Sequence, residues 1–267
     1  MSQNESADAP GFHRLAVGLE YDGTAYSGWQ IQPHAPSVQA TLNLAVSRVA
    51  DEPVDCVGAG RTDTGVHAAV QVVHFDTRAT RSHREWVLGI NSNLPDDVNV
   101  LWARSVPQDF HARYSAVERG YRYRILNRPV RSALERHRAW WVRQPLDDGA
   151  MRQAAAHFIG EHDFSAFRAA ACQSRTPMRN LTRLDIIRNV QMVAIEVEAN
   201  AFLHHMVRNI VGTLVRVGTG EASPEWIVEL LASRDRKLAG MTAPAAGLSL
   251  VTVRYPERFG LPAGLAG

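Results

Sequence analysis

The chain has 267 residues, of which 45% are hydrophobic, enough to bury the core of one large domain or two ordinary ones. The formal net charge is only +2, so overall charge selects no class of partner. No apolar run reaches the roughly 20 residues of a membrane span, and residues 1–13 lack the pattern of a signal peptide. The two cysteines, Cys56 and Cys172, have no metal-site spacing, which favours a reducing, cytoplasmic setting.

The first half of the chain predicts the order β-α-β-β-α-β. Residues 13–21 alternate apolar and polar side chains before an Asp-Gly turn, as a strand does. Ser37 precedes apolar residues with helical spacing and predicts a helix cap. The predicted elements are strand 13–21, helix 38–49, strands 54–60 and 69–77, helix 85–91 and strand 96–106.

The second half predicts the same plan with one additional helix. Its elements are strand 121–126, helix 147–159, strands 179–188 and 191–200, helices 202–217 and 223–232, and strand 247–255. Ser223 and Pro224 are expected to begin the last of these helices. We therefore predict an α+β fold of two tandem ferredoxin-like halves, with antiparallel sheets and a catalytic cleft between them. The expected parts are a disordered tail, 1–11, and two domains, 12–108 and 109–267.

Arginine and aromatic residues are concentrated between His111 and Gln144. Nine arginines lie there against only Glu118 and Glu135, interleaved with tyrosine and tryptophan. Arginine forks bind phosphate oxygens and aromatic faces stack on bases, so the mixture favours nucleic acid. A solvated face in an arginine-rich chain explains the pattern equally well at this point.

Residues 58–67, "GAGRTDTGVH", form a glycine-rich loop around one aspartate. The glycine spacing does not fit a dinucleotide site, and the chain has no Gly-Lys-Ser/Thr of a P-loop. An aspartic protease needs a second carboxylate, yet Asp63-Thr64-Gly65 is the only such tripeptide. Asp63 then has two interpretations: a nucleophile held ionised, or a turn cap paired with Arg61.

Histidines offer no evident metal site. His204 and His205 are adjacent and, from a regular helix, cannot both face one ion. We expect no metal and no cofactor.

The loop "GAGRTDTGVHA" strongly resembles the catalytic loop of tRNA pseudouridine synthases of the TruA type. Six further segments resemble that family in the same order: 21–32, 110–116, 121–125, 160–168, 172–177 and 200–214. The likeness extends from about residue 12 to 256. Thr64 stands where the family most often has alanine, a small change that we expect to be tolerated.

The resemblance implies isomerisation of uridine to pseudouridine at tRNA positions 38, 39 and 40, without metal or cofactor. Asp63 is then the catalytic carboxylate and Arg208 its charge partner. Tyr121 and Leu248 line the substrate pocket, and Arg61 fills the space of the flipped base. The implied tRNA contacts are Arg81, Phe110, His111, Ala112, Arg113, Tyr114, Ala171, Cys172, Gln173, Ser174 and Arg175.

The family members are homodimers, so the resemblance also implies a cytoplasmic homodimer with tRNA as its partner. A non-catalytic RNA-binding protein on the same scaffold, with Asp63 structural, is the alternative.

Overall fold

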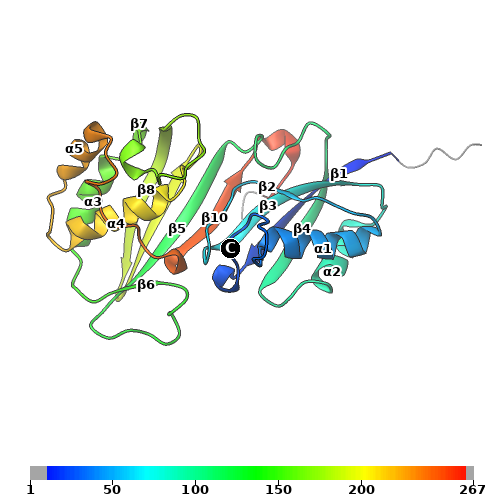
Figure 1. Ribbon diagram of the computed structural model, residues 1–267, viewed down its shortest axis with the longest axis horizontal. Helices are drawn as coiled ribbons and strands as arrows, with labels where there is room; N and C mark the ends of the chain where they lie inside the picture. The colour runs from blue at the N-terminus through cyan, green and yellow to red at the C-terminus, as the bar shows by residue number, and fades with distance from the viewer. Residues whose placement is uncertain (1–10, 263–267) are drawn as a thin grey trace, which may run out of the picture.

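The computed structural model describes residues 11–262, which fold around one continuous ten-stranded sheet (Figure 1). The predicted disordered tail lies outside the described residues, apart from Gly11. In the first half the elements are β1 (His13–Tyr21), α1 (Val38–Ala50), β2 (Val57–Gly58), β3 (His67–Thr77), α2 (His83–Asn91) and β4 (Val98–Val106).

The second half has a longer list of elements. They are β5 (Glu118–Asn127), β6 (Trp140–Val142), α3 (Asp148–Ala156), β7 (Gly160–Asp163), β8 (Met178–Asn189), β9 (Met192–Ala199), α4 (Met206–Gly218), α5 (Trp226–Ser233) and β10 (Leu248–Arg254). Residues 11–262 also contain four short 3-10 helices: Gly23–Ala25, Ser165–Phe167, Ala245–Gly247 and, after β10, Glu257–Phe259. No helix within residues 11–262 combines the length and the apolar character needed to cross a membrane.

Each half has the strand order of a ferredoxin-like unit. In the first half β4 pairs with β1, β1 with β3, and β3 with β2; in the second half the order is β10-β5-β9-β8. These neighbours are antiparallel throughout. The predicted α+β class is confirmed. Figure 1 shows α1 and α2 beside the first-half strands and α3, α4 and α5 gathered beside the second-half strands.

The two sheets predicted from the repeat are joined edge to edge. β10 pairs in parallel with β3, through Ser249 with His67 and Leu250 with Ala68. On its other side β10 pairs antiparallel with β5. The last strand of the chain therefore lies between the halves, directly beside the residues that follow the glycine-rich loop. The division into domains 12–108 and 109–267 stays a prediction.

Local hydrogen bonds determine where the helices begin, and some of these starts differ from the predicted ones. Ser37 caps α1 as predicted, accepting from the backbone N–H of Ala40. α2 begins earlier than predicted, because Ser82 and Glu85 form a capping box. The predicted Ser223 cap of α5 is wrong: Ser223 and Pro224 form a preceding turn through their carbonyl groups, and the helix begins at Trp226.

Two further predictions need correction. α4 was expected to begin at residue 202 but begins at Met206, because His205 has a left-handed backbone with φ of 61°. The predicted strand 54–60 is reduced to β2, two residues long. The short strands β6 and β7 were not predicted, since three or four residues give too little alternation to be recognised.

Candidate active site

The glycine-rich loop enters β3 through a tight turn with a fixed backbone. The N–H of Val66 donates to the Asp63 carbonyl at 3.1 Å, and Gly65 has a positive φ of 75°. The N–H of Trp29 donates to the Thr62 carbonyl at 3.0 Å, while the Thr62 hydroxyl is hydrogen-bonded to Tyr21 at 2.8 Å. These bonds hold the backbone on both sides of Asp63 and limit where its side chain can point.

Gly28 allows the preceding segment to approach this turn. Its φ is 95°, and a Cβ at this position would lie 2.5 Å from the Thr62 carbonyl oxygen. Only glycine has both the backbone freedom and the absence of a side chain that this approach requires.

Two side chains from the sheet, the buried Gln71 and the half-buried Arg119, hold the other arm of the loop. The Gln71 amide donates to the Gly60 carbonyl at 2.7 Å. The Arg119 guanidinium donates to the Ala59 carbonyl at 3.0 Å. Sequence reasoning missed both supports, because neither residue lies in the loop or in a recognised motif.

Asp63 is surrounded by side chains from the second half of the chain. Arg208 Nη1 lies 3.0 Å from Asp63 Oδ2, and the exposed fractions of the Arg208 and Asp63 side chains are 15% and 22%. Arg208 Nε also donates to the Ala243 carbonyl at 2.7 Å, which fixes the guanidinium plane. Asp63 pairs with Arg208 across 145 residues of sequence, as the family resemblance implied.

Two histidines complete the group around Asp63. His205 Nε2 lies 3.3 Å from Asp63 Oδ2, and His204 Nε2 lies 3.4 Å from Oδ1. The two rings are 4.0 Å apart. Burial lowers the pKa of His205 and favours its neutral form, with Asp63 opposing this effect and His204, Arg208 and Arg236 adding to it.

The sequence-based objection to paired histidines was wrong. It assumed that His204 and His205 lie in a regular helix, whereas both precede α4 and face the same carboxylate. The ligand atoms of the two histidines and Asp63 lie within 4.8 Å of one another, a spacing that a metal ion could use. Arg208 already pairs with Asp63 Oδ2, and its positive charge opposes a cation there.

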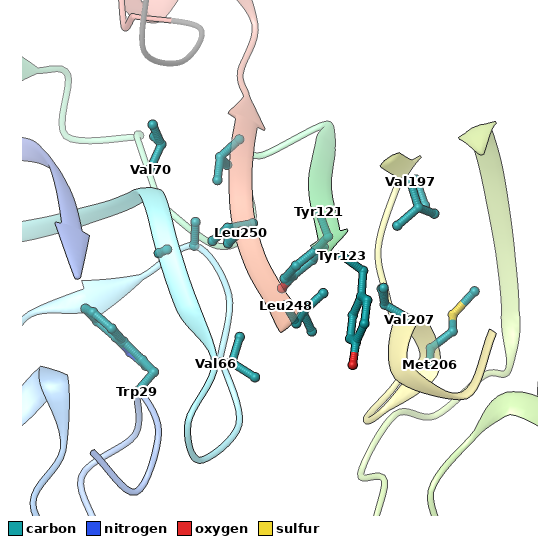
Figure 2. Close-up of a cluster of buried hydrophobic side chains, with 14 of the residues drawn as sticks. Trp29, Val66, Val70, Tyr121, Tyr123, Val197, Met206, Val207, Leu248 and Leu250 are labelled. Atoms are coloured by element: carbon teal, nitrogen blue, oxygen red, sulfur yellow. The ribbon is translucent and has the colours of Figure 1, made fainter. Parts of the chain in front are cut away.

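Tyr121 and Leu248 form an apolar wall beside this group. Tyr121 is 8% exposed and packs edge-on against Phe202, with ring centroids 5.1 Å apart. A Cβ at Gly60 would lie 3.9 Å from the Tyr121 hydroxyl, so this hydroxyl faces the loop. Burial raises the pKa of Tyr121 to about 12. Figure 2 shows Tyr121 and Leu248 between the loop carrying Val66 and the start of α4.

Arg61 is exposed and is not among the residues that pair with Asp63. Its Nε donates to the Gln30 side chain at 3.0 Å, and its Nη1 lies 3.5 Å from the Gln173 side-chain oxygen. Arg208, not Arg61, is therefore the arginine paired with Asp63. The interpretation of Arg61 as the ion partner of a structural turn is wrong.

The predicted RNA-contacting segment 110–114 is partly core. Phe110 and Ala112 are fully buried, so the expectation that their side chains contact tRNA is wrong. Phe110 packs against the rings of Tyr255 and Phe259. The burial of apolar surface, rather than contact with RNA, therefore explains a phenylalanine at this position. His111 is half-buried and its Nδ1 accepts from the backbone N–H groups of the next turn.

Other predicted RNA contacts lie on the surface. Tyr114 is 77% exposed, with the Arg113 guanidinium 5.7 Å from its ring centroid. Ala171, Gln173 and Arg175 are exposed, whereas Cys172 and Ser174 are half-buried. This second segment adjoins the Asp63 group, since the His204 N–H lies 3.4 Å from Cys172 Sγ. Arg81 is exposed before α2 and bonds only to the backbone carbonyls of Thr80 and Val49.

The nine arginines of residues 111–144 do not form a uniform basic surface. Three are in ion pairs: Arg122 with Glu196, Arg124 with Glu135, and Arg138 with Asp22. Arg119 and Arg128 donate mainly to backbone carbonyls. The exposed ones with no ion pair among the described residues are Arg113, Arg131, Arg136 and Arg143. The expected electrostatic surface is therefore smaller than the sequence indicated.

The chain is similar to one known family and to individual proteins over most of its length. The family model described as tRNA pseudouridine synthase matches residues 19–115 and 154–256. A protein of Hydrogenovibrio crunogenus named tRNA pseudouridine synthase A is 54% identical over 248 residues, which is 93% of this chain and 95% of that protein. A protein of the same name from Methylococcus capsulatus is 54% identical, covering 93% of this chain and 92% of that protein.

A third relative of that name, from Coxiella burnetii, is 52% identical over 93% of this chain and 95% of its own length. A solved archaeal box H/ACA sRNP Nop10–Cbf5 complex resembles the chain weakly, with a TM-score of 0.38 and 12% identity over 91% of this chain and 49% of that one. The family match covers well over half of the chain, and the relatives cover nearly all of it. The chain belongs to the tRNA pseudouridine synthase family.

Proposed function

We propose that this protein isomerises uridine to pseudouridine in tRNA, at positions 38, 39 and 40 of the anticodon arm, with Asp63 as the catalytic carboxylate. One observation carries the assignment of Asp63: its carboxylate is held by Arg208 beside the wall of Tyr121 and Leu248. The family membership and the names of the relatives support the reaction.

The proposed reaction has no net change in atoms. The bond between C1′ and N1 breaks, the uracil turns, and a bond between C1′ and C5 forms; C5 loses its proton and N1 gains one. A carboxylate can act as the nucleophile that carries the intermediate or can assist elimination, and Asp63 serves either role. The Tyr121 ring offers a face on which the uracil stacks.

The target uridine must leave its stack before it can reach Asp63, which costs a few kcal/mol. Arg61 is exposed two residues before Asp63 and bonds only to amide side chains of Gln30 and Gln173, which RNA can replace. We propose that it fills the space that the flipped base leaves. This role needs a mobile, solvated cation, and the position of Arg61 supports it.

RNA contact is proposed for the exposed residues of the two flanking segments. Arg113 and Tyr114 offer a cation and a stacking surface, and the exposed Gln173 and Arg175 flank Cys172, which contacts the His204 backbone. Arg81 is proposed as a more distant phosphate contact. The proposal includes a cytoplasmic homodimer, in which a second copy extends the surface that holds the tRNA.

Replacement of Asp63 tests this function. Asp63→Asn should keep tRNA affinity and abolish pseudouridine formation, because an amide cannot replace the carboxylate. Pseudouridine is mapped in tRNA treated with wild-type protein, with Asp63→Asn and with the surface control Asp96→Asn, which should keep full activity. Retained turnover in Asp63→Asn would contradict the catalytic role, and an inactive wild type that binds tRNA would favour the non-catalytic RNA-binding protein.

A further inference from the structure

We infer that His205 is a positioning residue of the pseudouridine reaction: its Nε2 holds Asp63 Oδ2 from the side opposite the substrate. The inference rests on the proposed function and adds a residue to which no role has been assigned. Two groups meet at Oδ2, Arg208 Nη1 at 3.0 Å and His205 Nε2 at 3.3 Å. With Arg208 donating to this oxygen and the His205 ring lying against it, the carboxylate can present its other oxygen in one orientation.

The backbone of His205 supports a functional reason for its position. It has the left-handed conformation at φ of 61°, which costs an ordinary side chain roughly 1 kcal/mol. Its side chain makes no capping hydrogen bond to α4, so helix capping does not explain this cost. Local strain of this kind is found at sites where a side chain must point in one direction. Here the direction is toward Asp63.

Backbone hydrogen bonds anchor the segment before α4 on both sides of His205. The Ala169 N–H donates to the His204 carbonyl at 3.0 Å, and the N–H of Met206, a buried residue, donates to the Leu203 carbonyl at 3.0 Å. Arg208 lies in the first turn of α4, directly after this anchored segment. His205 and Arg208 therefore approach Asp63 as one rigid unit.

His204 differs from His205 in ways that separate their roles. Its side chain is 40% exposed, against 28% for His205, and it lies near Oδ1 rather than Oδ2. Oδ1 is the oxygen without an arginine, so it is the one available to the substrate. His204 must give way when a uracil ring enters, whereas His205 can stay in place.

The contact from His205 uses Nε2, and this gives a specific test. In the neutral tautomer that carries its proton on Nε2, the imidazole can donate to a carboxylate from this position. The amide nitrogen of glutamine reaches about as far from the backbone as Nε2, whereas that of asparagine corresponds to Nδ1. Asparagine, however, tolerates the left-handed backbone better than glutamine does. Activity and stability should therefore respond to the two substitutions in opposite order.

The experiment compares His205→Ala, His205→Gln and His205→Asn in the full-length protein, measuring kcat and KM for tRNA and the thermal midpoint. His205→Ala should lower kcat about 10- to 100-fold while KM changes less than about threefold. His205→Gln should recover most of kcat, and His205→Asn should not, although the Asn variant should have the higher thermal midpoint of the two. His157→Gln, at the C-terminal cap of α3, is the matched control and should behave as wild type.

Three results would overturn the inference, and the first two are recovery by Asn as complete as by Gln and a kcat of His205→Ala within about twofold of wild type. Loss of activity that follows the thermal midpoint across all variants would also overturn it, since it would mean a structural role. A wild type that forms no pseudouridine overturns the proposed function and this inference together. An active wild type with any of the first three results overturns this inference alone.

Discussion

Replacing Arg208 by methionine tests the electrostatic organisation of the site. The change removes the charge but keeps an unbranched apolar stem, so the packing of α4 is disturbed little. It deletes two bonds at once, Nη1 to Asp63 at 3.0 Å and Nε to the Ala243 carbonyl at 2.7 Å. Asp63 then keeps only the two histidines as neighbours at hydrogen-bonding range.

The expected loss of free energy depends on how far the Arg208 and Asp63 side chains are buried. Breaking a fully buried ion pair by removal of one partner costs about 3–5 kcal/mol. Both side chains here keep some exposure, 15% and 22%, and the histidines remain, so about 2 kcal/mol is expected. If that energy is lost from the transition state, kcat falls about 30-fold. Arg208→Lys keeps the charge but cannot reach both acceptors, so its loss should be intermediate.

Single-turnover formation of pseudouridine measures the rate of the chemical step. Equilibrium binding measures the affinity for tRNA. Arg208→Met should slow the chemical step and leave tRNA affinity within about threefold of wild type. Arg216→Met is the control on the same helix, because Arg216 lies over the Trp226 ring and away from Asp63. Weakened binding with an unchanged chemical step would refute the reasoning and place Arg208 on the RNA surface.

Two further predictions concern stability. Gly28→Ala should lower the free energy of unfolding by more than about 2 kcal/mol, because it adds a clash with Thr62 to backbone strain. Gly220→Ala, also at positive φ but with open space around it, should lose only about 1 kcal/mol; equal losses in denaturant titrations would contradict the reasoning. Burial lowers the pKa of His74 to about 4, so stability should fall as pH drops from 6.5 to 4, by at most about 3 kcal/mol. His74→Gln should flatten that pH profile, and an unchanged slope would contradict the assignment.

The sequence predicted the helices and long strands well because their patterns are local. Ser37 and the alternation of residues 13–21 carry the information for their own elements. The union of the two sheets was not predictable in this way. The pairing of β10 with β3 joins Ser249 to His67, and no short-range pattern records a partner so far along the chain.

The candidate site shows the same limit. Asp63 could be singled out from its loop, but the role of Arg208 came from family resemblance and its contact from the structure. His205 was dismissed because its left-handed backbone depends on packing around it, not on its own sequence neighbours. Phe110 was misplaced on the RNA surface because a motif does not reveal which of its members face the core.

The position of β10 has a consequence for how the molecule is made. Its residues are among the last of the described chain, yet they separate β3 from β5 and supply Leu248 to the site. During synthesis the Asp63 loop leaves the ribosome about 180 residues before the strand that will lie beside it. Contacts of such long range form slowly. A chain interrupted before Leu248 can form many of its helices and hairpins. Its Asp63 loop, however, lacks β10, the strand that lies beside the loop in the complete site.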